Sequence, residues 1–165
     1  MIKAIFFDFD MTLVNSKPIA HASYRALLKY KNQKPTRAGF DAYIGRRVSE
    51  SIEKLAKNES ERKELNKIFL KVHKNKTKSL KVYGKETLKY LKSKKIKVII
   101  LSNNAKEVIK TTCKVHKLHF DNIIADEDLK YGEKKHQALI RTINKLGMKK
   151  SEVFYVGDHI NDVKE

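Results

Sequence analysis

Two pairs of acidic residues directly follow apolar runs of the chain and could together hold a metal ion and a phosphate. Asp8 and Asp10 follow a run near the N-terminus, and Asp158 and Asp162 follow another near the C-terminus. Magnesium prefers oxygen ligands and keeps several waters, so two or three carboxylates and a substrate phosphate can complete its coordination. Paired acids alone commonly cap a helix or face solvent, so the hypothesis depends on what accompanies them.

Two further segments supply a hydroxyl and an ammonium group. Ser102 and Asn103 follow the apolar run that ends at Leu101, and a hydroxyl there can bind a phosphoryl oxygen. Lys134 and Lys135 precede a helical pattern, where an ammonium can neutralise developing phosphate charge. Alone, the serine is more simply a helix cap and the lysines a charged surface. We choose Lys134 as the phosphate-binding lysine, with Lys135 as the alternative.

Four short apolar runs must position these side chains, and each is continuous rather than alternating. Continuous runs are typical of strands buried on both faces of a parallel sheet, and helical patterns separate the later ones. The carboxyl ends of such strands share the edge where open α/β sheets bind ligands. We therefore predict an α/β fold with a Rossmann-like parallel sheet. The runs are Ala4 to Phe9, Val98 to Leu101, Ile123 to Ala125 and Val153 to Val156.

The segment between the first and second runs is too long for one crossover helix. About ninety residues separate Phe9 from Val98, and they contain helical patterns of their own. We predict an inserted α-helical cap over residues 15–79, carried by a core of residues 1–14 and 80–165. Pro35, Thr36 and Gly39 mark the gap after the first helix. The expected cap helices are Ser16 to Tyr30, Ser49 to Lys57 and Ser60 to about Lys78.

Charge and composition limit the partners and the compartment. A formal charge of +18 attracts anions, which suits a small phosphorylated metabolite. Nucleic acid is not favoured, because the lysines are scattered along the chain rather than gathered in one block. No segment approaches the roughly 20 apolar residues of a membrane span, so we expect no membrane partner. Cys113 is the only cysteine and the N-terminal run lacks a secretory pattern, so we expect a cytoplasmic protein. We expect a monomer or weak dimer.

The order and spacing of these segments resemble those of a known family. The chain is similar to haloacid dehalogenase-like hydrolases, and the flanks of the first motif resemble its phosphoglycolate phosphatase-like branch. This resemblance implies a HAD-like core with a small helical cap that closes over the site. The matching motifs are Asp8-x-Asp10-x-Thr12, Ser102, a lysine near position 134 and Gly157-Asp158-x-x-x-Asp162.

The resemblance also implies a role for each catalytic residue. Asp8 would be the nucleophile that forms an aspartyl-phosphate, and Asp10 would be the acid and base. Ser102 and Lys134 would hold the phosphoryl oxygens. A magnesium ion would be bound by Asp8, the backbone carbonyl of Asp10, Asp158 and, as a further contact, Asp162.

Other expected contacts lie beside these motifs. Thr12 and Asn103 are candidate substrate-binding residues within them. In the cap loop from Tyr43 to Val48, Arg46 or Arg47 could bind a carboxylate or a second phosphate through a bidentate fork, although a solvated arginine pair explains them equally well.

The sequence thus predicts a magnesium-dependent phosphatase that hydrolyses a small phosphomonoester. An acid at position 10 favours phosphoryl transfer over dehalogenation, because dehalogenase members of the family lack it. One alternative is a phosphomutase of the same fold, and another is a nucleic-acid-associated phosphatase or binding protein. Met11 departs from the pattern, because the family usually has glycine there.

Overall fold

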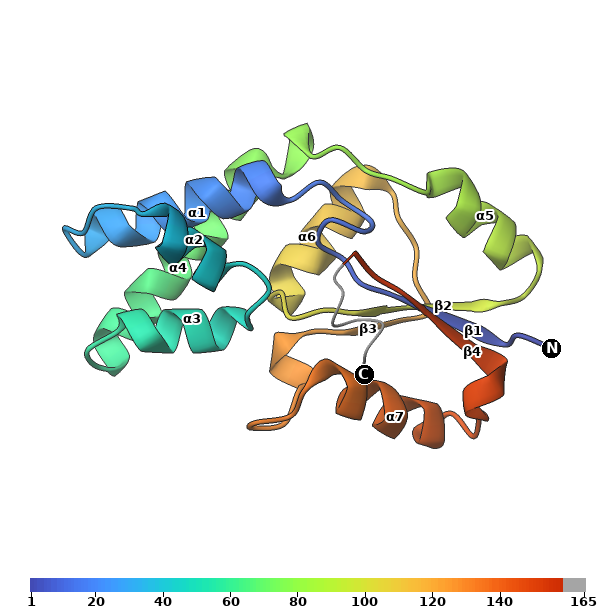
Figure 1. The fold of residues 1–165 in the computed structure, drawn as a ribbon. Helices are drawn as coiled ribbons and strands as arrows, with labels where there is room; N and C mark the ends of the chain where they lie inside the picture. Colours follow the sequence, from blue (N-terminus) through green and yellow to red (C-terminus); the bar gives the residue numbers. More distant parts are fainter. Residues whose placement is uncertain (159–165) are drawn as a thin grey trace.

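The chain forms one parallel sheet covered by helices on both faces, with further helices beyond its carboxyl edge (Figure 1). This computed structural model describes residues 1–158, so Asp162 lies outside the described residues. The strand order β3-β2-β1-β4 has every neighbour parallel, which confirms the predicted α/β class. The strands are β1 (Ala4–Phe7), β2 (Lys97–Leu101), β3 (Asn122–Ile124) and β4 (Val153–Val156).

Alternate residues of the strands build two separate halves of the core. Phe7 and Ile100 pack with α5 (Lys85–Ser93) and α6 (Lys106–His116) on one face. On the other face, Phe6 and Ile99 pack against α7 (Lys135–Lys145) and are at most 1% exposed. Because both faces of β1 and β2 are buried, their sequences read as continuous apolar runs.

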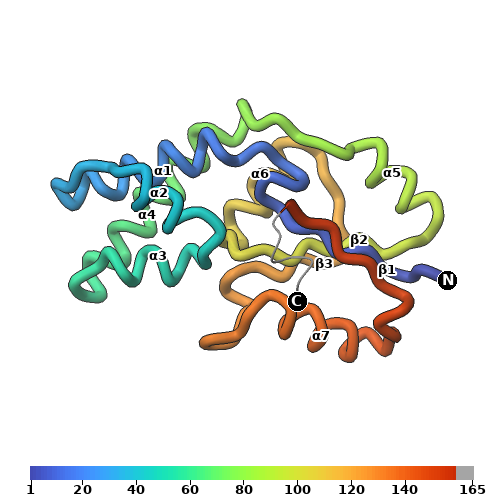
Figure 2. The backbone as a smooth tube through the Cα atoms, viewed as in Figure 1, coloured from blue at the N-terminus to red at the C-terminus, as the bar shows by residue number. Residues whose placement is uncertain are grey.

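Four of the helices between β1 and β2 lie to one side of the sheet (Figures 1 and 2). They bury Leu27, Leu65 and Phe69 among themselves, together with Val108 from α6. The boundaries of the two domains at residues 14 and 79 stay a prediction. The helices are α1 (Lys17–Tyr30), α2 (Arg37–Tyr43), α3 (Val48–Leu55) and α4 (Glu59–Lys76), and the 3₁₀ turn η1 (Thr77–Ser79) follows.

Helix α2 was not predicted, because its punctuating residues were interpreted as a gap. Thr36 is instead the N-cap, and its side-chain oxygen accepts a hydrogen bond from the Gly39 amide at 3.1 Å. Gly39 lies within the helix, where a Cβ atom would fall 2.1 Å from the phenol oxygen of Tyr24. The glycine therefore permits close packing of α2 on α1 rather than ending a helix.

The two connections between the sheet and these helices lie side by side. The Asn15 amide donates to the Lys81 carbonyl at 2.9 Å, and the Tyr83 amide donates to the Leu13 carbonyl at 2.8 Å. Val14 and Val82 form an antiparallel bridge between them. The chain therefore enters and leaves the four helices through one short paired segment.

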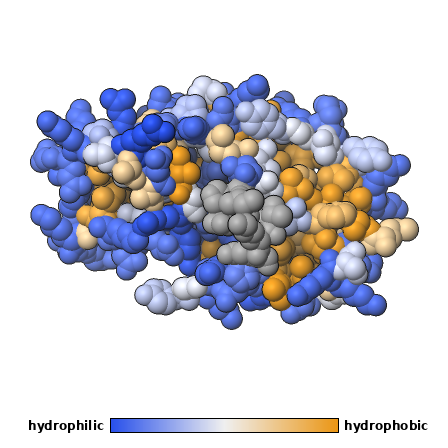
Figure 3. All heavy atoms as spheres, viewed as in Figure 1, coloured by the Kyte–Doolittle hydropathy of each residue, from blue (hydrophilic) through white to orange (hydrophobic). Residues whose placement is uncertain are grey.

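Apolar side chains on the face drawn in Figure 3 gather over the sheet, whereas most of the surface of the four helices is hydrophilic. Phe154 and Val156 of β4 are among the exposed large apolar residues. Within residues 1–158, none of the helices is both long and apolar enough to cross a membrane.

Candidate active site

A cavity of about 800 Å³ lies between the carboxyl edge of the sheet and the cap helices. Such a volume is typical of small-molecule sites, which span roughly 300–1,000 Å³. The core contributes charged and polar side chains from the ends of three strands and the start of α7. Among these lining residues are Asp8, Asp10, Ser102, Asn103, Lys135 and Asp158.

Asp8 lies at the floor of this cavity, one residue beyond β1. Its amide donates to the Val156 carbonyl at 2.8 Å, which continues the pairing of β1 with β4. One carboxylate oxygen, Oδ1, accepts the Phe9 amide at 2.6 Å, and Oδ2 accepts the Lys135 ammonium at 2.7 Å. Burial raises the pKa of Asp8 to about 6, although Lys135 opposes the rise. The carboxylate is therefore held in place but poorly solvated.

The lysine bonded to Asp8 is Lys135, the alternative to our choice of Lys134, and both lysines line the cavity. Lys134 is the N-cap of α7, and its amide donates to the Gln137 side chain at 2.9 Å. The ammonium of Lys135, on the first helical residue, is the one that reaches Asp8. Burial disfavours its charge, but the carboxylate of Asp8 and the side chain of Tyr155 outweigh burial and raise the pKa of Lys135. Adjacent residues at a helix start point in different directions, so only one of them can face the cavity floor.

Glu133 forms a separate ion pair although it also lines the cavity. Its two carboxylate oxygens accept Nε and Nη2 of Arg141 at 2.8 and 2.9 Å. This hydrogen-bonded guanidinium lowers the pKa of Glu133 to about 2. The acid therefore stays ionised and paired along α7.

Asp10 is held by a residue that the sequence did not single out. The side-chain amide of Asn104 donates to both carboxylate oxygens of Asp10, at 3.2 and 3.0 Å. The Asn104 backbone amide in turn donates to the hydroxyl of Ser102, which is fully buried and lines the cavity. Asn104 directly follows Ser102 and Asn103 in the sequence, but its contact with Asp10 joins two segments far apart in sequence.

The turn after Asp10 explains why the family usually has glycine at the next position. Met11 has a φ of 60°, in the left-handed region that disfavours side chains. Thr12 lies within this turn but does not line the cavity, and its hydroxyl is buried without a partner among residues 1–158. The substrate contact of Thr12 stays a prediction.

Arg47 lines the cavity and is also bonded to the core, and its substrate contact stays a prediction. Its Nε donates to the Asp126 carboxylate at 2.6 Å, and Nη1 donates to the Lys130 carbonyl at 2.9 Å. Nη2 donates to the carbonyls of Asp126 and Leu129 at 2.8 and 3.2 Å. Arg46 also lines the cavity, but it is exposed and makes no hydrogen bond or ion pair within the described part of the chain.

Asp126 completes a clamp, by which we mean the contacts of Arg47 and Ser49 with Asp126. The amide and hydroxyl of Ser49 both donate to its carboxylate, at 2.6 and 2.9 Å. Asn103 strengthens the same junction, because its side chain donates to the Gly45 carbonyl at 2.9 Å rather than to open cavity. Asp126 was not predicted as a functional residue, although its place directly after the third apolar run is a signal that the sequence carries.

Oxygen donors for a metal ion face the same cavity from two strand ends. Asp8, Asp10 and Asp158 line it, and Asp158 is exposed at the last described position. No group of three or more histidine, cysteine, aspartate or glutamate side chains within residues 1–158 is arranged to hold a metal. Within the part of the chain that the structure describes, a backbone carbonyl is available as a further ligand, and waters and a substrate phosphate can complete the coordination of an ion bound here.

Sequence comparison agrees with this arrangement. A model of the family described as haloacid dehalogenase-like hydrolase matches residues 5–165. The chain belongs to this family. It is 30% identical to a phosphoglycolate phosphatase from Aquifex aeolicus, over 99% of this chain and 79% of that protein. It is 26% identical to the pyrophosphatase PpaX from Bacillus cereus, over 98% of this chain and 77% of that protein.

Solved structures share the fold of this haloacid dehalogenase-like hydrolase. A predicted phosphoglycolate phosphatase from Haemophilus somnus has a TM-score of 0.79 at 23% identity, covering 98% of this chain and 79% of that chain. A hydrolase from Pseudomonas syringae has a TM-score of 0.77 at 18% identity, covering 97% of this chain and 78% of that chain. Together with the phosphatase relatives, the family identifies the chain as a phosphoric monoester hydrolase of the phosphoglycolate phosphatase-like branch.

Proposed function

We propose that this hydrolase releases phosphate from a small phosphomonoester through an aspartyl-phosphate on Asp8, with the help of magnesium. The observation that carries the proposal is the bonded carboxylate of Asp8 on the cavity floor, 2.7 Å from the Lys135 ammonium. A carboxylate that is ionised and fixed in position can attack phosphorus directly. Lys135 and Ser102 lie where they can bind the phosphoryl oxygens of the substrate.

In the first step, an oxygen of Asp8 forms a bond to phosphorus while the bond from phosphorus to the alcohol oxygen breaks. Asp10 donates a proton to that departing oxygen, which leaves as a neutral alcohol. The ammonium of Lys135 balances the negative charge that spreads over the phosphoryl oxygens. Asn104 fixes the orientation of Asp10 for this transfer.

In the second step, a water molecule attacks the phosphorus of the aspartyl-phosphate. Asp10, now ionised, accepts a proton from this water, and the bond between phosphorus and Asp8 breaks to release inorganic phosphate. Both steps use the same carboxyl group in opposite directions, which requires that it keep one position throughout. The two hydrogen bonds from Asn104 provide this restraint.

The donor set at the cavity floor fits magnesium. Asp8 and Asp158 would bind the ion together with the backbone carbonyl of Asp10, and all three are oxygen donors. The raised pKa of Asp8 supports this fit, because a buried carboxylate is stabilised by added positive charge. When bound, the ion supplies further charge stabilisation at the transferred phosphoryl group.

Hydrolysis of para-nitrophenyl phosphate, with and without magnesium, tests the proposal. We expect magnesium-dependent release of phosphate that falls on the order of 10⁴-fold or more in Asp8→Asn. Asp10→Asn should also lose activity because it can neither donate nor accept the proton. Activity that survives in Asp8→Asn would refute the aspartyl-phosphate. Return of the phosphoryl group to a sugar instead of water would identify the phosphomutase alternative.

A further inference from the structure

The cap side of the cavity differs chemically from its floor, because its buried lining residues carry no fixed charge. Ser51 and His73 are each 7% exposed, and Phe69 is 2% exposed. Tyr43 adds a phenol to the same wall. This set forms the part of the cavity that faces whatever is attached to the phosphoryl group, since the phosphoryl group itself lies over Asp8.

Ser51 has a buried hydroxyl that no residue from 1 to 158 satisfies. It lies on α3, one turn after the clamp that fixes the start of this helix. Buried polar groups are nearly always hydrogen-bonded, so an unpaired hydroxyl on a cavity wall points to a ligand that completes it. A hydroxyl can both donate and accept, which suits another hydroxyl.

His73 adds an acceptor to the wall. Its Nδ1 lies 3.0 Å from the Phe69 carbonyl and 3.3 Å from the Ser23 hydroxyl. Because a carbonyl only accepts, Nδ1 carries the hydrogen, and burial lowers the pKa of His73 so that the ring is neutral. Its Nε2 is then an acceptor, and it has no partner within the described part of the chain.

Tyr43 supplies a donor within the cavity that Asp10, the proposed acid and base, also lines. Burial raises the pKa of its phenol, and the charge of Asp10 adds to the rise, so the phenol stays protonated. An alcohol that takes its proton from Asp10 would then lie in the cavity that Tyr43, Ser51 and His73 line.

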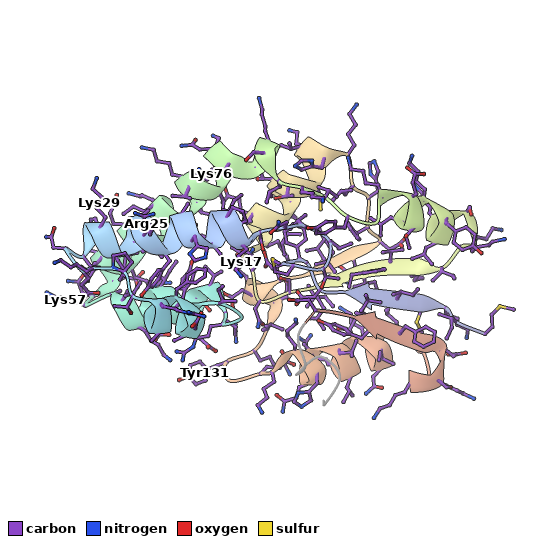
Figure 4. All side chains as sticks on the ribbon, turned by 45° about the horizontal axis from the view of Figure 1, so that its top comes forward. Lys17, Arg25, Lys29, Lys57, Lys76 and Tyr131 are labelled. Atoms are coloured by element: carbon purple, nitrogen blue, oxygen red, sulfur yellow. The ribbon has the colours of Figure 1, made fainter. Side chains whose placement is uncertain are left out.

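The cations that the cap contributes to the cavity are either exposed or already paired. Lys17 and Arg46 are solvent-exposed, whereas Arg47 is 14% exposed and bound to Asp126. In Figure 4, Lys17 lies at the end of α1 nearest the core, whereas Arg25 and Lys29 lie farther along the helix. A second anionic group placed against the buried wall would lose hydration, and the charge of Arg47 is already balanced by Asp126.

We propose that Tyr43, Ser51 and His73 form a subsite for a leaving group that is a small neutral alcohol with additional hydroxyls. The substrate would then be a polyol or sugar phosphate rather than a phosphate ester with a carboxylate or second phosphate. This assignment rests on the proposed function, because it assumes that the phosphoryl group is bound at Asp8. The hydroxyls of the leaving group would form hydrogen bonds with the Ser51 hydroxyl and with the Nε2 acceptor of His73.

The test compares kcat/KM for glycerol 3-phosphate and ethyl phosphate, which differ in the leaving group's hydroxyls. We expect the wild type to prefer glycerol 3-phosphate over ethyl phosphate and over phosphoglycolate and pyrophosphate. Ser51→Ala and His73→Phe should each lower the ratio of glycerol 3-phosphate to ethyl phosphate by about three- to tenfold, the effect of one lost hydrogen bond. Ser60→Ala, an exposed cap residue, should keep the wild-type ratio.

Two results would overturn the subsite while leaving the phosphatase intact. One is a preference for phosphoglycolate or pyrophosphate in the wild type, and the other is an unchanged ratio in both variants. If folded wild type hydrolyses none of these compounds, the proposed function fails instead. Calorimetric binding of glycerol 3-phosphate and ethyl phosphate then decides the subsite, because equal affinities contradict it and tighter binding of glycerol 3-phosphate supports it.

Discussion

The floor of the cavity and its cap wall differ in the charge and the hydrogen bonding of their side chains. At the floor, charged groups are bonded to one another, as Lys135 is to Asp8 and Asn104 is to Asp10. At the cap wall, buried groups are neutral, and the hydroxyl of Ser51 has no partner among residues 1–158. In the proposed function, the floor binds the phosphoryl group, which all phosphomonoesters share, and the cap wall binds the leaving group, which differs between substrates.

The two regions are joined by the clamp of Arg47, Ser49 and Asp126. The Asp126 carboxylate is buried and accepts three hydrogen bonds from the cap. The clamp therefore sets the distance between the cap wall and Asp8. Substitutions in the clamp, at the cavity floor and in the turn after Asp10 test whether the two regions act independently.

Removing the clamp should have the largest effect. Asp126→Ala leaves the Arg47 guanidinium, 14% exposed, without its carboxylate. We expect the free energy of unfolding to fall by about 3–5 kcal/mol, as when one partner of a buried ion pair is removed. Urea unfolding measures this change. The exposed pair of Arg37 and Asp41 is the control, and Asp41→Ala should cost at most about 1 kcal/mol. Equal losses in the two variants would contradict a structural clamp.

Substitutions of the adjacent Lys134 and Lys135 distinguish the effect of a charge at the cavity floor from that of a charge elsewhere on the molecule. We expect Lys135→Ala to lower kcat/KM for para-nitrophenyl phosphate about 100-fold, close to 3 kcal/mol, because it removes a charge that faces the phosphoryl group. Lys134→Ala removes the same charge from the molecule but not from the floor, so its kcat/KM should change less than about threefold. A larger loss in Lys134→Ala would favour Lys134 as the phosphate-binding lysine.

The pH dependence of stability tests the burial of Asp8. Its pKa is about 6 in the folded protein against an ordinary value of 3.8, so the folded state binds more protons between these values. Without magnesium, the free energy of unfolding of the wild type should therefore fall as pH rises from about 4 to 6, by on the order of 2 kcal/mol. Asp8→Asn cannot ionise and should lack this decline.

Urea unfolding of both proteins at several pH values measures this difference. The advantage of Asp8→Asn over the wild type should grow through this pH window and stay constant above it. Parallel curves for the two proteins would show that Asp8 is not poorly solvated. Magnesium added at neutral pH should narrow the gap, since the ion stabilises the ionised carboxylate of the wild type.

The turn that follows Asp10 should show the smallest effect. Met11→Gly should raise the free energy of unfolding by about 1 kcal/mol, because glycine adopts a φ of 60° without the steric penalty of a side chain. Asn32 has a φ of 53°, but asparagine tolerates this region, so Asn32→Gly should gain only a few tenths of a kcal/mol. Thermal unfolding of the two variants measures both changes. A lower stability of Met11→Gly than of the wild type would show that the Met11 side chain makes stabilising contacts.

The sheet was readable from the sequence because β1 and β2 are buried on both faces and carry no alternating polar positions. The positions of Asp8, Asp10 and Ser102 followed from it, since the carboxyl ends of parallel strands meet at one edge. Helix α2 was missed because Gly39 reads as punctuation when its packing against Tyr24 is unknown.

Only the tertiary structure decided which polar groups meet. Lys134 and Lys135 are indistinguishable in sequence, and the geometry at the start of α7 directs one of them to Asp8. The hydrogen bond between Asn104 and Asp10 spans 94 residues, and that between Arg47 and Asp126 spans 79. A periodic pattern reports whether a side chain is buried, but a specific contact depends on the relative placement of elements. The sequence therefore determined the sheet and its catalytic edge, whereas the folded chain determined the lysine, the clamp and the cap wall.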